Sequence, residues 1–424
     1  MVFLRFLSTA LLVANAILFI YSLYTILIAL FSLRPSKDRR NTLLKAHHNM
    51  PQKQHRFAIL IAARNEGAVI GNLIESLRHQ QYPAHLYDVI VVPNNCTDNT
   101  KIVAAQAGAR ILTCRQAVRS KGDVLSQVLP EISQRKMGYD AICVIDADNL
   151  VHPGFLGAMN DALLGGATVA QGYRDSKNPH DSAISGSYSI YFWLLNRFYN
   201  RSRHNAGLST PIGGSGFMIQ TALVRKMADM HFATLTEDLE LTILCHLAGE
   251  KVAWVPKAIV YDEQPLTFRQ SWKQRSRWSS GMYQIGALYT RPILKKAWQD
   301  RRLRGLDLIA LYMSAHIQVL WFATMVINAL TGLLQLLNNR TTPAIMMQQT
   351  AYFLLVTWLS VTGVAILTIL LERKLRIGIV QGMLFFWLFI MSWLPINLCC
   401  LFHRTSSWEQ IKHERSIRLH DLPS

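Results

Sequence analysis

The chain alternates between long apolar stretches and one long polar middle. The first apolar stretch, residues 6–33, contains no charged side chain. A membrane-spanning helix needs about 20 such residues at 1.5 Å per residue, whereas the apolar core of a cleaved signal peptide has only about 7–15. Residues 6–33 therefore predict an uncleaved membrane anchor. Three further apolar stretches follow near the carboxyl end, at residues 306–337, 350–371 and 377–402.

Basic residues indicate which side of the membrane the connecting segments face. A basic cluster follows the first stretch, so the positive-inside rule places that side in the cytoplasm and the amino terminus outside. Loop 372–376 is also basic and fits the inside, whereas loop 338–349 carries one charge, Arg340, and fits the outside. The cluster after the first stretch consists of Arg34, Lys37, Arg39, Arg40, Lys45, Lys53 and Arg56.

The last apolar stretch leaves two alternatives open. A third full crossing places the carboxyl-terminal tail outside, but the tail is basic, which favours the inside. Pro395 favours a break of this stretch into a re-entrant or interfacial segment. We expect about three full crossings within residues 306–403, with the broken segment as the alternative. The basic residues of the tail include Arg404, Lys412, Arg415 and Arg418.

Short β-branched runs alternate with amphipathic stretches in the polar middle. This alternation is typical of βαβ units and a mostly parallel sheet, so we expect an α/β domain. The expected strands are residues 57–62, 88–92, 110–113 and 141–145, and the expected helices are 68–79, 99–107 and 121–134. The chain then divides into an anchor (1–33), a cytoplasmic domain (34–265), an interfacial amphipathic segment (266–305), membrane helices (306–403) and a basic tail (404–424).

Composition narrows the class of protein further. Half of the residues are hydrophobic and only 17% are charged, against about 25% in a typical soluble domain. Lys and Arg number 44 against 26 Asp and Glu, a formal net charge of +18, which favours nucleic acid, an anionic membrane surface or anionic substrates as partners. The basic residues cluster at the membrane borders and no nucleic-acid-binding motif occurs, so we expect no nucleic-acid partner. A transporter is disfavoured because only Asp307 and His316 stand out as ionisable groups in the predicted spans.

Several common site types are absent from the sequence. None of the six cysteines forms a CxxC pair, which argues against a zinc site and a disulfide framework. Neither a GxGxxG fingerprint after the first strand nor a Walker A loop occurs.

Polar side chains follow three of the expected strands. Ligands of open α/β sheets bind beyond the carboxyl ends of the strands, so these side chains predict a common binding rim. Ordinary turn chemistry is the alternative for any one strand end, because Asn and Asp favour turns. The residues are Arg64, Asn65 and Glu66 after the first strand, Asn94, Asn95, Thr97 and Asp98 after the second, and Asp146, Asp148 and Asn149 after the fourth.

An ordered set of motifs gives this rim a family resemblance. Over about residues 55–290 and the flanking membrane helices, the sequence resembles the family-2 membrane glycosyltransferases, which include cellulose, hyaluronan, chitin-oligosaccharide and poly-N-acetylglucosamine synthases. The resemblance implies a GT-A-type fold, which is Rossmann-like with a mostly parallel sheet. Each motif is weak alone, and their order and separation carry the resemblance. The motifs are Ala-Arg-Asn-Glu at 63–66, Asn-Cys-Thr-Asp at 95–98, Lys121-Gly122, Asp146-Ala147-Asp148, Gly213–Gly216, Thr236-Glu237-Asp238, and Gln274 with Arg277-Trp278.

The resemblance implies a nucleotide-sugar donor and a divalent cation. A cation held by carboxylates neutralises the charge that grows on the departing diphosphate, and oxygen ligands suit Mg²⁺ or Mn²⁺. By resemblance Asp148 binds the metal and Asp146 lies near the nucleotide. A solvated turn is the structural alternative for both. The implied donor-binding residues are Ala63, Arg64, Glu66, Asn94, Lys121 and Asp146, with Asn94 standing where many relatives have Asp.

The remaining motifs are expected on the acceptor side. By resemblance Asp238 is the general base for the acceptor hydroxyl and Glu237 supports it; helix capping by this Thr-Glu-Asp sequence is the alternative. Gln274, Arg277 and Trp278 are expected to contact acceptor and diphosphate, with the indole stacked on a sugar ring and the guanidinium paired with phosphate. The alternative for this segment is an interfacial helix facing lipid head groups.

Together these expectations define a reaction. We expect an inverting transfer of a sugar from a UDP-sugar by single displacement, extending a β-linked polysaccharide at the plasma (inner) membrane with the catalytic domain in the cytoplasm. Single transfer onto a lipid acceptor is the alternative. The expected partners are the UDP-sugar, a saccharide or lipid-linked acceptor, membrane lipids, and an accessory subunit or second copy of the chain.

Overall fold

The computed structural model describes residues 2–35, 53–134, 136, 138–227, 230–301, 304–338, 341–403 and 415–422. Most of the basic cluster after the first span lies outside the described residues, as do Arg340, Arg404 and Lys412. The predictions made for those residues stay predictions.

One eight-stranded sheet forms the centre of the α/β domain, in the order β3-β2-β1-β4-β7-β6-β8-β5. The half built by the first strands is parallel, as predicted: β1 (Phe57–Ala63), β2 (Tyr87–Pro93), β3 (Arg110–Ile111) and β4 (Ala141–Val144). The other half is mixed, because β7 (Phe217–Gln220) runs antiparallel to both β4 and β6 (Val169–Ser176), whereas β8 (Val252–Asp262) is parallel to β6 and antiparallel to β5 (Leu150–Val151). The sequence analysis predicted individual strands and helices for the first half only.

Alternation along β1 explains how helices cover both faces of the sheet. Phe57, Ile59 and Ile61 pack on one face, and Ala58 and Leu60 pack on the other, all fully buried. Successive strand side chains point to opposite faces, and each large apolar side chain buried in this way contributes about 1.5–3 kcal/mol. One face is covered by α3 (Ile70–Arg78), α4 (Thr100–Gln106) and α6 (Phe155–Leu164), and the other by α5 (Lys121–Gln134), α9 (Thr221–Lys226) and α10 (Glu237–Leu247).

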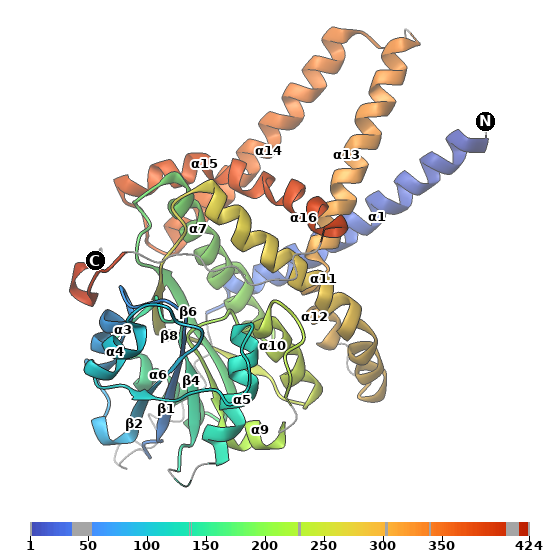
Figure 1. Cartoon of the computed structure of the whole chain (residues 1–424). Coiled ribbons are helices and arrows are strands. Elements are labelled where there is room, and N and C mark those ends of the chain that lie inside the picture. Colours follow the sequence, from blue (N-terminus) through green and yellow to red (C-terminus); the bar gives the residue numbers. More distant parts are fainter. Residues whose placement is uncertain are drawn as a thin grey trace.

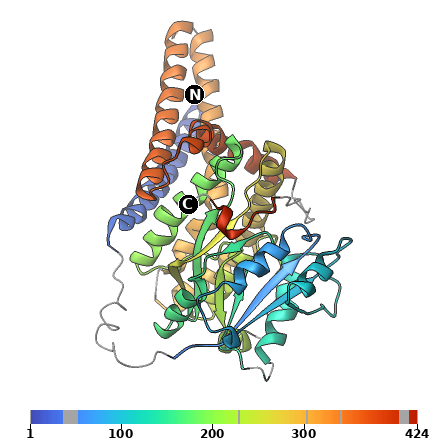
Figure 2. The same cartoon turned by 90° about the vertical axis from the view of Figure 1, so that its left-hand side faces the viewer.

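Four helical segments are long and apolar enough to cross a membrane among the described residues. The first belongs to α1 (Val2–Leu30), and two others are α13 (Ser314–Leu337) and α14 (Pro343–Leu371), which rise side by side away from the α/β domain (Figures 1 and 2). The predicted stretch 306–337 is divided into α12 (Arg304–Tyr312) and α13. The helix predicted at 350–371 begins earlier, at Pro343, because the Thr342 hydroxyl accepts a hydrogen bond from the Ile345 amide and proline suits the first helical turn.

The last apolar stretch is broken. It forms α15 (Val380–Met391) and α16 (Trp393–Phe402), separated at Ser392, and Figure 1 shows both running across the direction of α13 and α14. Pro395 has no amide hydrogen for the carbonyl four residues earlier, which disfavours a continuous helix here. The guanidinium of Arg275 also binds at the break, donating to the Phe389 carbonyl at 2.9 Å and the Ser392 hydroxyl at 2.8 Å.

The described part of the tail returns to the α/β domain. Arg415 forms an ion pair with Asp181, and Ser416 accepts a hydrogen bond of 2.9 Å from the side-chain amide of Asn72. These contacts hold residues 415–422 on the same side of the membrane helices as the α/β domain.

The segment expected to be amphipathic forms one long helix, α11 (Phe268–Gln299). It packs against α12 and α16, and it lies between the α/β domain and the membrane helices (Figure 1). Asp307, noted above as an ionisable group in a predicted span, forms an ion pair of 3.1 Å with Arg203 and accepts a hydrogen bond of 2.5 Å from Tyr24. It therefore joins α1 to α8 (Ser202–Asn205) and α12 as part of the structure.

Candidate active site

A cavity of about 400 Å³ lies between the sheet and α11. Residues at the ends of β1, β2, β4 and β8 form one side of it, and residues 272–274 and 276–278 of α11 also line it. The structure brings the predicted catalytic, donor, metal and acceptor residues, with the exception of Ala63, to its wall: Arg64, Glu66, Asn94, Lys121, Asp146, Asp148, Glu237, Asp238, Gln274, Arg277 and Trp278. Of the other residues predicted for the rim, Asn149 lines the cavity, whereas Asn65, Asn95, Thr97 and Asp98 do not. The predicted rim at the carboxyl ends of the strands therefore exists, and the roles assigned to its residues stay predictions.

Ala63 contributes through its backbone. Its carbonyl accepts hydrogen bonds from the Asn94 amide at 2.9 Å and from the Asn94 side chain at 3.1 Å. Asn94 is thereby oriented at the wall by the end of β1.

Ordinary turn chemistry accounts for Asp98, which does not line the cavity. Its carboxylate accepts hydrogen bonds from the Thr100 hydroxyl at 2.5 Å and the Gly67 amide at 3.0 Å. Burial would raise the pKa of this carboxyl, but these hydrogen bonds outweigh burial and lower it. Asp98 thus stabilises the loop before α4, and the alternative weighed for a single strand end applies here.

Lys121 lies at the first turn of α5, among the carboxylates of the cavity. Its ammonium forms an ion pair with Asp146, donates to the Gly214 carbonyl at 2.6 Å and lies 3.9 Å from the Glu237 carboxylate. Burial alone would lower the pKa of Lys121, but Asp146 and Glu237 raise it above its ordinary value. Lys121 is therefore a charged group of the cavity rather than a solvated surface lysine.

The two acids at the start of α10 lie beside one another, with Glu237 buried and Asp238 half-buried. Burial raises the pKa of the Asp238 carboxyl, against the opposing effects of the Leu239 amide, Lys121 and Arg277 among others. Burial and the neighbouring Asp238 likewise raise the pKa of Glu237. The hydroxyl of Thr236 makes no capping hydrogen bond to α10, so side-chain capping by Thr236 does not explain this motif.

The acids at the end of β4 suit a cation carried by a diphosphate. Among the described residues, no group of three or more His, Cys, Asp or Glu side chains can hold a metal ion by itself. In nucleotide sites, however, Mg²⁺ is usually held by one or two carboxylates together with phosphate oxygens and water, and Asp146 and Asp148 supply such carboxylates on the wall. Burial, followed by the charges of Asp148 and Asp146, raises the pKa of Asp262 to about 6 despite the nearby Arg174. This surplus of negative charge fits a divalent cation.

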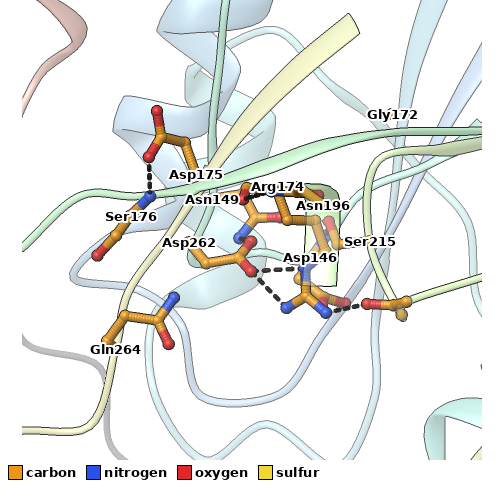
Figure 3. A network of polar contacts seen from close by, with 12 residues as sticks. Asp146, Asn149, Gly172, Arg174, Asp175, Ser176, Asn196, Ser215, Asp262 and Gln264 are labelled. Carbon is orange, nitrogen blue, oxygen red and sulfur yellow. Dashed lines mark hydrogen bonds and ion pairs between the residues drawn. The ribbon is translucent and has the colours of Figure 1, made fainter. Parts of the chain in front are cut away.

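Arg174 and Asp262 are site residues that the sequence interpretation missed. Both line the cavity, and they form an ion pair in which Arg174 Nε donates to Asp262 at 2.6 Å (Figure 3). Asp262 ends β8, so the strand-end rule that selected Asp146 would have selected it too, had residues 252–262 been recognised as a strand.

The predicted acceptor residues project from α11. Gln274 has a buried side-chain oxygen with no hydrogen-bond partner among the described residues. Trp278 lines the cavity, but its ring stacks on Trp393 of α16 with ring centres 6.2 Å apart, and Tyr188 and Phe192 meet it edge-on. One face of the indole therefore packs on α16.

Comparison with known proteins identifies the domain. Residues 55–281 match the family model described as "Glycosyltransferase like family 2". The chain is 27% identical over 252 residues to "Probable glycosyltransferase YdaM" of Bacillus subtilis, covering 53% of this chain and 55% of that protein. It is 26% identical over 253 residues to "Beta-monoglucosyldiacylglycerol synthase" of a Nostoc species, covering 58% and 53%. The chain thus spans about half the length of these curated relatives.

Two further proteins extend the comparison. "Poly-beta-1,6-N-acetyl-D-glucosamine synthase" of Staphylococcus epidermidis is 20% identical over 295 residues, covering 69% of this chain and 68% of that protein. Among solved structures, the mannosyltransferase PcManGT from Pyrobaculum calidifontis, in complex with GDP-Man and Mn²⁺, aligns with a TM-score of 0.60 at 15% identity, over 94% of this chain and 100% of that one. That likeness confirms the expected GT-A-type architecture with flanking helices, and the family match carries the conclusion: the chain belongs to the family-2 glycosyltransferases.

Proposed function

We propose that this enzyme is a membrane-bound inverting glycosyltransferase that moves a sugar from a UDP-sugar to a hydroxyl group of a membrane-borne acceptor. One observation carries the proposal. The cavity has strand-end carboxylates, Asp146 and Asp148, on one part of its wall and the neighbouring acids Glu237 and Asp238 on another, with Lys121 between them. A donor diphosphate with its cation and an acceptor hydroxyl need two such acidic positions in one cavity.

Asp148, assisted by Asp146, would hold the divalent cation of the donor. Mg²⁺ or Mn²⁺ supplies charge stabilisation for the departing diphosphate. Lys121 provides a second positive charge beside Asp146, and Arg64, Glu66 and Asn94 line the same part of the cavity, where the uridine would bind.

Asp238 would remove the proton from the acceptor hydroxyl. Its raised pKa makes the carboxylate a stronger base than an exposed Asp. The acceptor oxygen then forms its bond to the anomeric carbon as the bond to UDP breaks on the opposite face, which inverts the configuration and gives a β-linkage. Glu237 and Arg277 lie beside this base and tune its charge.

We favour a lipid acceptor that receives one sugar. On the side of the membrane helices, Trp278 of the cavity wall stacks on Trp393 of α16, so a growing polymer leaving in that direction would have to displace this aromatic packing. Relatives named as beta-monoglucosyldiacylglycerol synthases agree with this choice. The second candidate is processive synthesis of a β-linked polysaccharide, favoured by Gln274, Arg277 and Trp278 on the cavity wall and by the poly-N-acetylglucosamine synthases among the relatives; it would need an accessory subunit or a second copy to complete a channel.

For the membrane arrangement, we propose three crossings rather than four. At 1.5 Å per residue, α15 and α16 are about 18 and 15 Å long, shorter than the roughly 30 Å of bilayer hydrocarbon, and the tail beyond them contacts the α/β domain. Helices α1, α13 and α14 then cross the plasma membrane, while α15 and α16 lie at its cytoplasmic surface. This arrangement replaces the expected third carboxyl-terminal crossing and removes its conflict with the basic tail. A reporter fused after the last residue should be active only in the cytoplasm; activity outside would contradict three crossings.

The donor assay tests the chemistry. Full-length protein in native membranes is given UDP-glucose, UDP-galactose, UDP-N-acetylglucosamine or GDP-mannose, and nucleotide release is measured with and without Mn²⁺. We expect metal-dependent release from one UDP-sugar, lost in Asp148→Asn and kept in Asp161→Asn, which changes an exposed acid outside the cavity. Release from GDP-mannose alone, or equal release by Asp148→Asn, would contradict the donor assignment. Product length on a gel then separates single transfer from a polymer.

A further inference from the structure

Arg174, on the cavity wall, takes part in a network of polar contacts (Figure 3). Its side chain is 18% exposed, and that of its partner Asp262 is 4% exposed. Arg174 also donates through Nη1 to the Gly213 carbonyl, and its guanidinium lies over the Phe192 ring, 4.4 Å from the ring centre. The guanidinium therefore binds protein groups on several sides.

The backbone around Arg174 is shaped for this contact. Residues 256–258 of β8 have no partner on β6, so the pairing shifts between Gly172 and Tyr173, just before Arg174. A side chain at Gly172 would place its Cβ 2.3 Å from the Ala258 carbonyl oxygen and 2.9 Å from that of Gly216. Such irregularities re-aim side chains at functional edges of sheets, and here the shift precedes the residue that reaches the turn at Gly213.

Two cations hold this turn from different elements. Arg174 binds the Gly213 carbonyl, and Lys121 binds the Gly214 carbonyl at 2.6 Å. Gly214 has a φ of +86°, and a Cβ placed there would lie 3.3 Å from a carboxylate oxygen of Asp238 and 3.9 Å from one of Asp146. The turn therefore lies between the carboxylate assigned to the donor side and the carboxylate assigned to the base.

The network also reaches the acidic loop after β4. Asn149 donates to the second oxygen of Asp262 at 2.7 Å, and Ser215 donates to Asn149. The hydroxyl of Ser215 in turn accepts a hydrogen bond of 3.0 Å from the Asp146 amide. Asp262 therefore connects two parts of the site. One is the Arg174 guanidinium, which holds the turn, and the other is the loop that carries Asp146 and Asp148.

From this geometry we propose that Arg174, held by Asp262, is a positioning residue: it fixes the Gly213–Gly214 turn and thereby sets the relative placement of Asp146 and Asp238 during transfer. The inference rests on the proposed function, because it assigns a role in that reaction. A displacement of about 1 Å at reacting groups costs on the order of 100-fold in rate, so a residue that only positions others affects turnover more than donor binding.

Two readouts test the role in full-length protein. In Arg174→Gln we expect kcat for the active UDP-sugar to fall about 100-fold while KM for it changes less than about threefold. Hydrogen exchange provides the second readout, because the Gly213 amide is bonded to Gln171 and the Gly216 amide to Val144. We expect both amides to exchange about tenfold faster in Arg174→Gln, without added nucleotide or metal.

The companion variants separate positioning from other roles. Asp262→Asn should change both readouts in the same direction, and the double variant should be little worse than Arg174→Gln, because both changes release the same turn. Arg174→Lys keeps the charge without the planar fork and should retain more kcat than Arg174→Gln; it replaces Arg174→Gln if that variant does not fold. Lys374→Gln is the matched control, because it removes a 2.6 Å ion pair to Asp175, the next residue of β6, without touching the turn.

The outcomes are distinct. A rise in KM with kcat unchanged would mean that Arg174 binds the donor, and independent, multiplying losses in the double variant would mean that Asp262 does not act through Arg174; either result overturns the inference. Unchanged exchange at Gly213 and Gly216 overturns it as well. If wild-type protein used no UDP-sugar, the proposed function would fail, while the exchange measurement would still decide whether Arg174 holds the turn.

Discussion

Two arginines, one in the sheet at the cavity wall and one in α11, are stabilised in different ways. Arg174, on the sheet side, is paired with the carboxylate of Asp262. Arg275, on the α11 side, is fully buried and pairs with no carboxylate within the described part of the chain; it donates to the Phe389 carbonyl and lies over the Phe389 ring, 4.4 Å from its centre, and near that of Trp393. Burial lowers the pKa of Arg275, whereas carboxylates, Asp262 foremost, raise that of Arg174 against the effect of burial.

The difference follows from what each arginine adjoins. The sheet side carries several acids, so a cation there balances charge and connects loops. The α11 side meets α15 and α16, where aromatic rings and the free carbonyls of a helix break are the available partners. Charge pairing therefore organises the sheet side of the cavity, and aromatic packing organises the α11 side, next to the membrane helices.

The same substitution at both sites should break this comparison most strongly. Arg174→Met leaves the buried Asp262 unpaired, and removing one partner of a buried ion pair costs about 3–5 kcal/mol. Arg275→Met removes the hydrogen bonds to the Phe389 carbonyl and the Ser392 hydroxyl, and the carbonyl keeps the Ser392 hydroxyl as a donor, so the loss should be about 1–3 kcal/mol. Thermal unfolding of both variants in detergent, beside wild type, measures the ranking. Equal losses would mean that Asp262 is not the main partner of Arg174.

A double substitution of both partners tests whether the unpaired Asp262 causes the loss of stability in Arg174→Met. Replacing the whole ion pair, Arg174→Met with Asp262→Leu, should restore most of the stability lost in Arg174→Met. Replacement of a buried ion pair by well-packed apolar residues is often neutral, or stabilises the fold by about 1–4 kcal/mol. The double variant should nevertheless lack transferase activity. A double variant as unstable as Arg174→Met would show that the network around Asn149, rather than charge, determines the cost.

On the sheet side, the sequence predicted the parallel half of the sheet but not the mixed half. The parallel half of the sheet follows from short β-branched, apolar runs between amphipathic stretches, and Arg64, Asn94 and Asp146 follow its strand ends as expected. The mixed half was not recognised, because the apolar pattern of residues 252–262 is interrupted by Pro256 and Lys257. Arg174 and Asp262 were therefore missed, since their pairing depends on strands β6 and β8 lying side by side.

On the membrane side, hydropathy located the apolar stretches but not their path. Residues 377–402 carry no charged side chain and form one of the four segments long enough to span a membrane, so the full crossing stays a prediction, as does the alternative that Pro395 indicated. The break depends on Arg275, more than 100 residues earlier, reaching the Phe389 carbonyl. Long-range contacts of this kind leave no periodic signal in the sequence.

The raised pKa of Asp262 predicts a smaller effect, on how the stability of the fold depends on pH. Because its folded-state pKa is raised to about 6 from an ordinary value of 3.8, the folded state binds the proton more tightly than the unfolded state. The protonated carboxyl therefore favours folding below about pH 4, and this advantage is lost as the pH rises through about 6, by at most about 3 kcal/mol. In the presence of a chelator, Asp262→Asn should lose less stability than wild type between pH 4.5 and 7. Parallel profiles for the two proteins would contradict the raised pKa.

The smallest effect is expected where α7 (Ala183–Leu194) crosses α15. A Cβ on Gly382 would lie 2.5 Å from backbone carbon of Gly186, so Gly382→Ala should cost about 1–3 kcal/mol through overpacking. Gly363→Ala is the control, because a Cβ at Gly363 meets no atom within 4 Å. Thermal unfolding compares the two. Equal stability of both variants would contradict close packing of α15 on the α/β domain.

The most direct test of the central claim separates donor binding from proton removal in one cavity. Wild-type, Asp148→Asn and Asp238→Asn proteins are compared for binding of UDP with Mn²⁺ by titration calorimetry and for transfer of labelled sugar from the active UDP-sugar. Loss of a general base lowers the rate about 10²- to 10⁴-fold, so Asp238→Asn should bind UDP with Mn²⁺ like wild type and transfer almost no sugar, while Asp148→Asn should lose metal-dependent binding. Wild-type transfer by Asp238→Asn would contradict the account.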